Sequence, residues 1–387
     1  FHTLGFSPLQ LAWLFLLYEL MGVVTNLSAG WLAARFGLTR TLYTGLGLQI
    51  AALLALTQLD PAWSVAASAG FVALAQGVSG VAKDLAKMSA KSAVKLLAPA
   101  TEGALFRWVA LLTGSKNAVK GAGFFLGAAV LGGLGFESSV IAMAAGLALV
   151  LAGVALFMPS GLPGGKARTP FRAVLSKDAA INRLSAARLF LFGARDVWFV
   201  VGVPIYFYGV LSDGSPEGNG AAFSLIGAFM AAWIIGYGAI QAAAPRLLNA
   251  RGKSVVEAAR LAAWWARALA LIPATLAALS LAGGDAAWVA AAMVAGLFAF
   301  GTVFALNASL HSYLILAFTS TERVTLDVGF YYMSNAAGRL TGTLLSGLSY
   351  QLGGLPLCLA TAAALAAASW LCARRLSASP SGSRRPA

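Results

Sequence analysis

The chain has 387 residues, of which 59% are hydrophobic and 10% are charged, and its mean hydropathy is +0.81. A soluble globular chain carries about 25% charged residues, so this composition excludes a soluble fold and indicates a membrane protein. The net charge of +14 suggests nucleic acid as a partner at first sight, but the placement of the cations argues against it.

Eleven apolar stretches of about 18 to 25 residues follow one another, and each is long enough to cross a hydrocarbon layer roughly 30 Å thick as an α-helix. The expected helices are Pro8–Ala33, Thr39–Leu56, Trp63–Val81, Leu105–Leu131, Val140–Phe157, Leu184–Tyr208, Ala221–Ala244, Ala258–Ala282, Ala286–Leu306, Val328–Tyr350 and Leu355–Ala373. The chain begins at Phe1 without Met or signal peptide, so we expect that one further helix precedes these in the complete protein.

Basic residues gather in alternate connections between these stretches. One set of connections, together with the C-terminal tail, carries Arg35, Arg40, Lys83, Lys87, Lys91, Lys95, Arg107, Lys166, Arg168, Arg172, Lys177, Arg183, Arg246, Arg251, Lys253, Arg323, Arg374, Arg375, Arg384 and Arg385. The other set has no Lys or Arg. Because cytoplasmic loops hold the excess of Lys and Arg, the pattern predicts a multi-pass protein of the inner (plasma) membrane with a cytoplasmic C-terminus, surrounded by lipid and not bound to nucleic acid.

Residues 159–183 form the longest polar interval and are rich in Gly, Pro and basic residues, which is typical of a linker. The expected divisions are an N-terminal bundle at 1–158, the linker at 159–183, a C-terminal bundle at 184–376 and a cytoplasmic tail at 377–387. The two halves resemble each other weakly at an offset of 220 residues, which aligns Lys91 with His311 and, after a two-residue slip, Asn117 with Asn335. A parallel repeat of two six-helix halves is known in transporters.

Residues 30–40 read Gly-Trp-Leu-Ala-Ala-Arg-Phe-Gly-Leu-Thr-Arg and resemble the Gly-x-Leu-x-Asp-Arg-x-Gly-x-x-Arg gate motif of the major facilitator superfamily. Gly30 and Gly37 allow close packing and a sharp turn, while Arg35 and Arg40 anchor the loop at the cytoplasmic face. Ala34 occupies the position of the Asp that stabilises the closed gate in that family. The resemblance implies an all-α polytopic membrane protein with the major facilitator fold of two six-helix bundles, of which eleven helices are present and the first is missing.

Four longer blocks, at Leu16–Glu19, Val81–Lys95, Leu112–Ala118 and Phe192–Gly202, are similar to the ArsJ-type permeases, the organoarsenical efflux branch of that superfamily. This resemblance implies export of 1-arseno-3-phosphoglycerate by alternating access, which confers arsenate resistance. It also implies proton coupling as the family default and a functional partnership with a glyceraldehyde-3-phosphate dehydrogenase that uses arsenate. The alternative is a major facilitator carrier for another organic anion, such as a sugar phosphate or organophosphate.

Four cations stand at membrane depth in the predicted helices. They are Lys116, Lys120, Arg195 and Arg339. A charge at the bilayer centre costs about 2.5 to 3.5 kcal/mol, so four together cost on the order of 10 to 14 kcal/mol unless they face water or find anions. Glu19 and Asp196 are the candidate anions, and two carboxylates leave an excess of about two positive charges.

This excess has two interpretations, an anion-binding cavity and structural pairing. In a cavity, the guanidinium and ammonium groups bind a small, multiply anionic organic substrate, and Asn117 and Asn335 bind its hydroxyl groups. Either Glu19 or Asp196 is then the candidate carrier of the coupling proton. In the pairing interpretation, Arg195 and Asp196 form separate interhelical salt bridges, because adjacent residues on a helix point about 100° apart.

A row of lysines four residues apart follows the third predicted helix. Lys83, Lys87, Lys91 and Lys95 fall on one slowly drifting stripe of a helix that extends below the membrane. The stripe is either a solvated or lipid-facing cytoplasmic surface or a cationic vestibule that concentrates anions.

An enzyme or a metal site is not expected. The sequence contains no HExxH, GxSxG or paired His/Cys cluster. His2 and His311 are far apart, and Cys358 and Cys372 have no CxxC spacing and are expected in the helix core. We therefore expect no catalytic activity, no metal and no cofactor.

Overall fold

The computed structural model describes residues 8–376, apart from residues 61, 100, 102, 160, 161, 163, 167, 250–252 and 285. The helices are α1 (Pro8–Phe36), α2 (Leu38–Leu56), α3 (Val65–Leu97), α4 (Ala104–Leu134), α5 (Phe136–Phe157), η2 (Phe171–Val174), α6 (Ala179–Val197), the π-helix η3 (Trp198–Gly202), α7 (Val203–Leu211), α8 (Pro216–Leu247), α9 (Val255–Gly283), α10 (Ala287–Phe318) and α11 (Val324–Ala373). If α6, η3 and α7 are counted as one rod and α11 as two, the described residues form the eleven long helices that the sequence predicts.

Within the described residues, six helices are long and apolar enough to cross a membrane by length and composition alone, with α6 and α7 counted together and α11 counted once: α5, α6 with α7, α8, α9, α10 and α11.

The predicted break between the last two helices is confirmed. Gly353 and Gly354 leave helical geometry inside α11, and Gly354 has a φ of +61°, a conformation that glycine adopts at little cost. The start of α6 differs from the prediction, since the helix begins at Ala179 and not at Leu184. The carboxylate of Asp178 accepts hydrogen bonds from the amides of Ala180 (2.7 Å) and Ile181 (3.0 Å), and this cap starts the helix inside the predicted linker.

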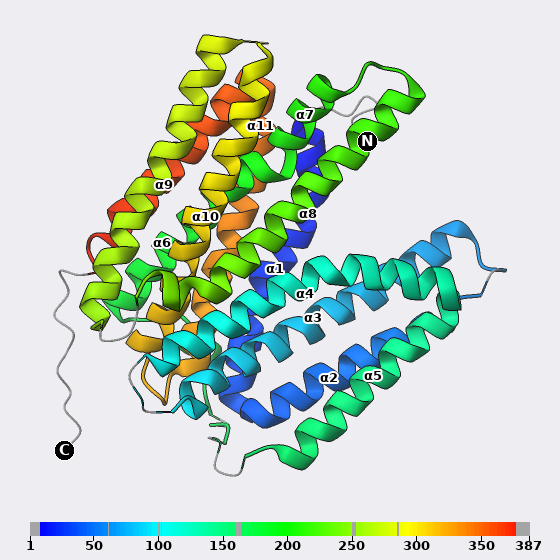
Figure 1. The fold of residues 1–387 in the computed structure, drawn as a ribbon. Helices are drawn as coiled ribbons and strands as arrows, with labels where there is room; N and C mark the ends of the chain where they lie inside the picture. The colour runs from blue at the N-terminus through cyan, green and yellow to red at the C-terminus, as the bar shows by residue number, and fades with distance from the viewer. Residues whose placement is uncertain are drawn as a thin grey trace.

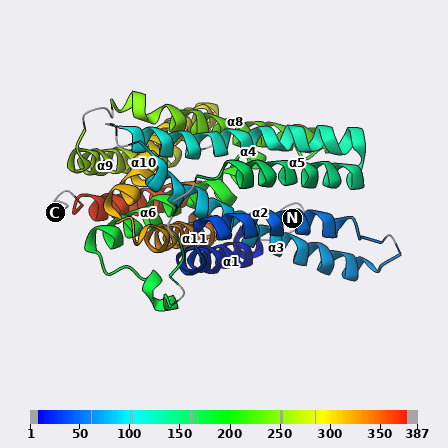
Figure 2. The same ribbon diagram turned by 90° about the horizontal axis from the view of Figure 1, so that it is seen from below.

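The helices form two groups that diverge as two arms (Figure 1). α1 to α5 make one arm and α6 to α11 the other, and α1 is the helix of the first arm that lies between α2–α5 and the second arm. α1 packs against α11 and α4 packs against α8, and Figure 2 shows both pairs from below.

Small residues allow the backbones of the two helices in each pair to come into contact. A Cβ atom added at Gly30 of α1 would lie 2.8 Å from the Cα atom of Gly329 in α11, and one added at Gly114 of α4 would lie 2.5 Å from the amide nitrogen of Ala242 in α8. Any side chain at Gly30 or Gly114 would therefore force the two arms apart. Close helix contacts in membrane bundles depend on small residues for this reason.

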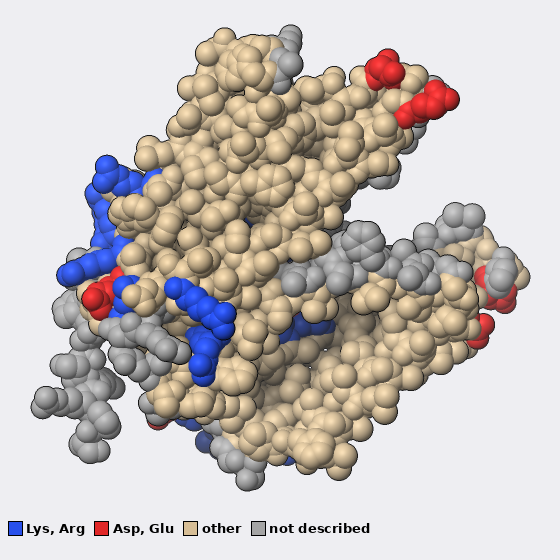
Figure 3. Space-filling view, in the orientation of Figure 1, with Lys and Arg blue, Asp and Glu red and all other residues tan. Residues whose placement is uncertain are grey.

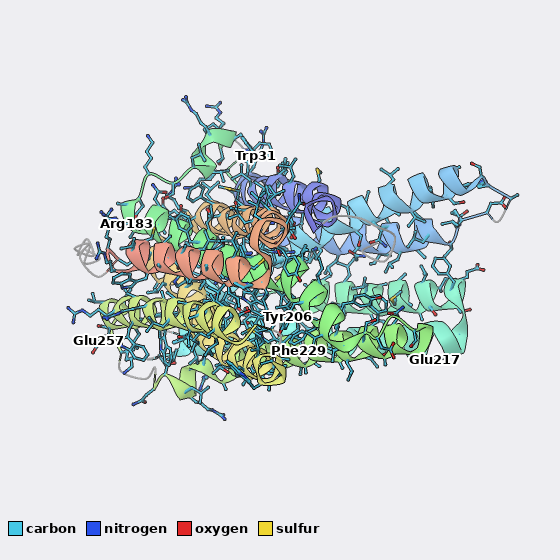
Figure 4. The ribbon with its side chains drawn as sticks, turned by 90° about the horizontal axis from the view of Figure 1, so that it is seen from above. Trp31, Arg183, Tyr206, Glu217, Phe229 and Glu257 are labelled. Carbon is cyan, nitrogen blue, oxygen red and sulfur yellow. The ribbon has the colours of Figure 1, made fainter. Side chains whose placement is uncertain are left out.

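The two ends of the molecule differ in charge, as the loop pattern predicts. Lys and Arg gather at one end and acidic side chains at the tips of both arms at the other (Figure 3). Arg183 lies at the first end and Glu217 at the second (Figure 4). We call these the basic end and the acidic end.

The arms are joined at the basic end and separate toward the acidic end. One apolar core contains residues of both arms, among them Met88, Val109, Leu184, Leu310 and Tyr331. The other two cores of the described residues each lie within one arm. Figure 3 shows the surface hollowed between the arms on the side of the acidic end.

Candidate functional site

An ion network joins the two arms between α1, α6 and α11. Arg339 donates through Nη2 to Oε1 of Glu19, and its Nε lies 3.4 Å from Oδ2 of Asp196. Arg195 donates through Nε to Oδ1 of Asp196 at 2.5 Å. Glu19 and Asp196 are 5% and 2% exposed. These four residues, which we call the central ion network, contain two cations and two carboxylates and are balanced in charge.

Close helix packing explains why Arg339 reaches Asp196. Gly338 and Gly342 stand four residues apart on α11, and a Cβ atom at either would lie within 2.6 Å of a backbone oxygen of α6. This Gly-x-x-x-Gly spacing lets the backbones of α6 and α11 approach. The π-helix η3 begins two residues after Asp196, and Ser346 of α11 accepts hydrogen bonds from its Val201 and Gly202 amides at 3.2 Å.

The structure brings together four of the residues that sequence reasoning selected, but it corrects one interpretation. Asp196 forms an interhelical salt bridge with Arg339, as the pairing interpretation expected, but Arg195 does not serve a separate one, because it bonds to Asp196 itself. The arginine side chain is long enough to fold back over the 100° between neighbouring helix positions, and it stacks on Phe192 and Phe304, with Cζ 4.8 Å and 5.5 Å from the ring centres.

A second polar cluster lies between α1 and α3 and includes Asp84. The Asp84 carboxylate accepts hydrogen bonds from Thr25 (2.6 Å), Asn26 (3.3 Å) and Lys87 (2.6 Å). Lys87 also donates to Oδ1 of Asn26 at 2.6 Å and lies 4.9 Å from the ring centre of Tyr332 in α11. The charge of Lys87 is therefore matched by a carboxylate.

Replacing Asp84 by Asn is expected to lower the midpoint of thermal unfolding of the purified protein. The substitution leaves the ammonium group of Lys87 partly buried without its carboxylate, and loss of one member of a buried pair costs about 3 to 5 kcal/mol. Asp60→Asn is the matched control, because Asp60 is exposed and caps only its own loop. Equal unfolding midpoints for Asp84→Asn and wild type would contradict the assignment.

A third cluster is cationic and has no carboxylate of the described residues within ion-pair distance. It contains Lys91 of α3, Arg188 of α6, and Asn307 and His311 of α10, which are at most 3% exposed. Both ring nitrogens of His311 and both amide atoms of Asn307 lack hydrogen-bond partners within the described residues. We call this set the buried cation cluster.

The two cations of this cluster bond only to neutral groups of the described residues. Arg188 donates from Nε to Oδ1 of Asn335 at 2.9 Å and from Nη1 to the carbonyl oxygen of Ala308 at 3.1 Å. Lys91 donates to the hydroxyl of Thr113 at 2.8 Å. Arg188 is also close enough to Lys91 and to His311 to interact electrostatically with both.

The lysine stripe of α3 is not a single solvated or lipid-facing surface, so that interpretation is wrong for two of its members. Lys83 is exposed and Lys95 half-buried, whereas Lys87 belongs to the Asp84 cluster and Lys91 is buried. The reason is that α3 continues as one helix to Leu97 while packed against α1 and α11.

The remaining predicted substrate residues lie apart from the central ion network. Lys116 is exposed on α4, one turn beyond Thr113, and interacts electrostatically with Lys91. Asn335 accepts the hydrogen bond from Arg188. The side chains of Asn117 and Lys120 lie outside the described residues.

Arg188 is the buried cation that sequence reasoning missed. It stands four residues after the predicted helix start at Leu184, where a long side chain reaches the membrane surface, but α6 begins at Ala179. Its seven-residue spacing from Arg195, with Phe192 between them, places all three on one face of the helix. That spacing is the signal that could have identified it.

The gate-motif residues lie at the basic end. Gly30 meets Gly329 of the other arm, and Gly37, with a φ of +91°, begins the turn into α2. The guanidinium of Arg35 lies 5.2 Å from the ring centre of Trp31, while Arg40 is exposed. The linker at 159–183 passes over this surface, where Nε1 of Trp31 donates a hydrogen bond to the carbonyl oxygen of Thr169 at 3.0 Å.

Within the described residues no group of three or more His, Cys, Asp or Glu side chains could hold a metal ion. Cys358 is fully buried, as predicted, with Sγ 3.1 Å from the hydroxyl of Ser349. Cys372 is half-buried at the end of α11.

The sequence matches no protein-family model and no curated protein. The fold matches solved structures over nearly the whole chain. A bacterial homologue of the iron transporter ferroportin, in an outward-facing state, has a TM-score of 0.72 at 13% identity, covering 95% of this chain and 90% of that chain. The major facilitator superfamily proton:xylose symporter XylE, bound to 6-bromo-6-deoxy-D-glucose, has a TM-score of 0.69 at 11% identity, with coverage of 94% and 85%. The human organic anion transporter MFSD10 has a TM-score of 0.62 at 18% identity, with coverage of 92% and 83%.

The chain therefore has the fold of major facilitator transporters, and the predicted fold class is confirmed: it is an all-α, multi-pass helical protein. These neighbours are transporters and not enzymes, in agreement with the prediction. At such low identities the likeness establishes the fold, and arguments about the cargo must come from the site.

Proposed function

We propose that this protein is an alternating-access exporter of a small, multiply anionic organic compound. The observation that carries the proposal is that two buried cations, Lys91 and Arg188, have no carboxylate of the described residues within ion-pair distance. The buried carboxylates Glu19, Asp84, Asp196 and Asp327 each have another cation as partner. A buried charge costs several kcal/mol unless an anion or water compensates for it. An anionic cargo in transit supplies that compensation.

The difference in charge between the two ends of the molecule supports export as the direction of transport. If the basic end faces the cytoplasm, as the excess of Lys and Arg there favours, the hollow between the arms opens to the outside. An exporter takes this arrangement when it releases its cargo, and the rocking of two bundles returns it to the cytoplasmic-facing arrangement. In this proposal the protein lies in the inner membrane, and its C-terminus is in the cytoplasm.

The proposed cargo is 1-arseno-3-phosphoglycerate, so that export confers arsenate resistance. An acyl arsenate at one end and a phosphate ester at the other end of three carbons match a site of guanidinium and ammonium donors, since guanidinium binds such oxygens through paired hydrogen bonds. A glyceraldehyde-3-phosphate dehydrogenase that uses arsenate would supply the compound, and proton entry through Glu19 or Asp196 would drive its export. The second candidate is export of a sugar phosphate or organophosphate, because phosphate and arsenate oxygens present the same charge and geometry to these donors.

Transport into everted membrane vesicles separates the two candidates. Vesicles that contain the protein are expected to accumulate arsenic when supplied with glyceraldehyde 3-phosphate, its dehydrogenase, NAD and arsenate, and omission of the dehydrogenase should abolish accumulation. Vesicles without the protein are the control. If 3-phosphoglycerate competes as effectively as 1-arseno-3-phosphoglycerate, the organophosphate candidate replaces the arsenical one. If neither anion accumulates or competes, the proposal of an anion exporter is wrong.

A further inference from the structure

We infer that the anion binds at the buried cation cluster between Lys91 and Arg188, and that the central ion network is not the anion site. This assignment rests on the proposed function and specifies where its cargo is held. The ligand class is an oxyanion with at least two negative charges, such as a three-carbon phosphate ester that also carries an acyl arsenate or a carboxylate.

Charge balance distinguishes the two sites. In the central ion network, Arg339 and Arg195 bond to Glu19 and Asp196, so an entering anion would have to displace two carboxylates. In the buried cation cluster, Lys91 and Arg188 bond only to neutral oxygens of the described residues. An anion there gains two unopposed cations without breaking an ion pair.

Unused polar groups point to the same place. Asn307 and His311 stand four residues apart on one face of α10, and among the described residues their side-chain nitrogens and oxygens have no hydrogen-bond partners although both side chains are fully buried. Buried polar groups in folded proteins normally have partners. A bound oxyanion would accept hydrogen bonds from Asn307 Nδ2 and from one nitrogen of His311, two buried donors that have no partner among the described residues.

The position of the cluster connects binding to the conformational change. Lys91 and Thr113 belong to the first arm, whereas Arg188, Asn307 and His311 belong to the second. Without an anion, Lys91 and Arg188 repel each other across the closed basic end, which favours opening toward the basic end. A bound dianion bridges the two cations and removes the repulsion, so the basic end closes around its cargo.

The assignment is tested on the purified full-length protein in lipid nanodiscs, with thermal unfolding measured over a titration of 3-phosphoglycerate. The wild-type midpoint is expected to rise with ligand, and Lys91→Gln and Arg188→Gln are expected to weaken binding at least tenfold. Lys95→Gln, one turn away on α3, and Arg260→Gln, on an exposed face of α9, should bind as wild type. Arg195→Gln should retain most of the affinity.

Lys91→Glu is a sharper variant, because it places a carboxylate opposite Arg188. It is expected to raise the unfolding midpoint without ligand and to abolish the response to 3-phosphoglycerate. Lys91→Glu therefore tests the site in a stable protein even if Arg188→Gln does not fold. Wild-type affinity in Lys91→Gln and Lys91→Glu, with loss of affinity in Arg195→Gln, would overturn the assignment but leave the exporter intact. If the wild-type protein responds neither to 3-phosphoglycerate nor to inorganic phosphate, the proposed function itself fails.

Discussion

Replacing Arg339 by Ala is expected to abolish export, with at least a 100-fold fall in initial rate, while the protein still inserts in the membrane. Arg339 is the residue of the central ion network that connects Glu19 of α1 with Asp196 of α6. Its loss leaves two buried carboxylates with one remaining arginine. Removing one member of a buried ion pair costs about 3 to 5 kcal/mol, and because Arg339 is 35% exposed we take the lower end, which corresponds to about a 100-fold effect. Rates are measured in everted vesicles at matched protein content.

Two further variants distinguish a role of the central ion network in proton coupling from a purely structural role. Arg339→Lys keeps the charge but loses the planar fork, so partial transport is expected. The double variant Glu19→Gln with Arg339→Gln removes both charges of one ion pair and should regain the thermal stability that Arg339→Ala loses. If Glu19 carries the coupling proton, the double variant remains inactive. Recovery of both stability and transport would show that the network is only structural, and wild-type export by Arg339→Ala would exclude any role in coupling.

Hydropathy predicts the helices of this protein well because the backbone of a membrane span must satisfy its own hydrogen bonds. The stretch predicted at Thr39–Leu56 differs from α2 by one residue, and the break before Leu355 follows from two adjacent glycines and a proline. The lysine spacing predicted that the third helix extends beyond Val81, and α3 does continue to Leu97, but the burial of this extension was not predicted. Lysines lower the hydropathy there, although part of the helix is covered by protein and not by water.

The site was predictable in its composition but not in its pairing. The depth of a charge within a span can be counted from the sequence, and this selected Glu19, Arg195, Asp196 and Arg339, which do meet. Which partner each residue takes depends on the rotation of the helices about their axes, and that is set by close contacts such as Gly342 against the backbone of Gly193. Lys91 was placed on a part of the third helix below the membrane and Arg188 was not selected, since hydropathy does not distinguish the membrane surface from the interface between two arms.

Replacing Gly30 by Leu is expected to hold the basic end open and to reduce export about 100-fold. A Cβ atom at this position would lie 2.8 Å from Gly329 Cα and 2.9 Å from the carbonyl oxygen of Thr325, and neither backbone atom can move aside without moving α11. Overpacking costs about 1 to 3 kcal/mol. This cost raises the free energy of the form in which the basic end is closed and not that of the open form. A shift of about 2.7 kcal/mol changes the ratio of open to closed forms roughly 100-fold.

The opening can be measured directly with an introduced cysteine. Met88 is fully buried in the core shared by the two arms, so Met88→Cys should react slowly with a maleimide reagent in the wild-type background and much faster with Gly30→Leu. Gly47→Leu is the matched control, because no atom lies within 4 Å of a Cβ atom at Gly47. Equal labelling rates in the Gly30→Leu and Gly47→Leu backgrounds would show that the glycine contact does not control closure. If Gly30→Leu still binds 3-phosphoglycerate but does not export it, anion binding precedes closure of the basic end, as expected for a cation cluster that is exposed when the arms part.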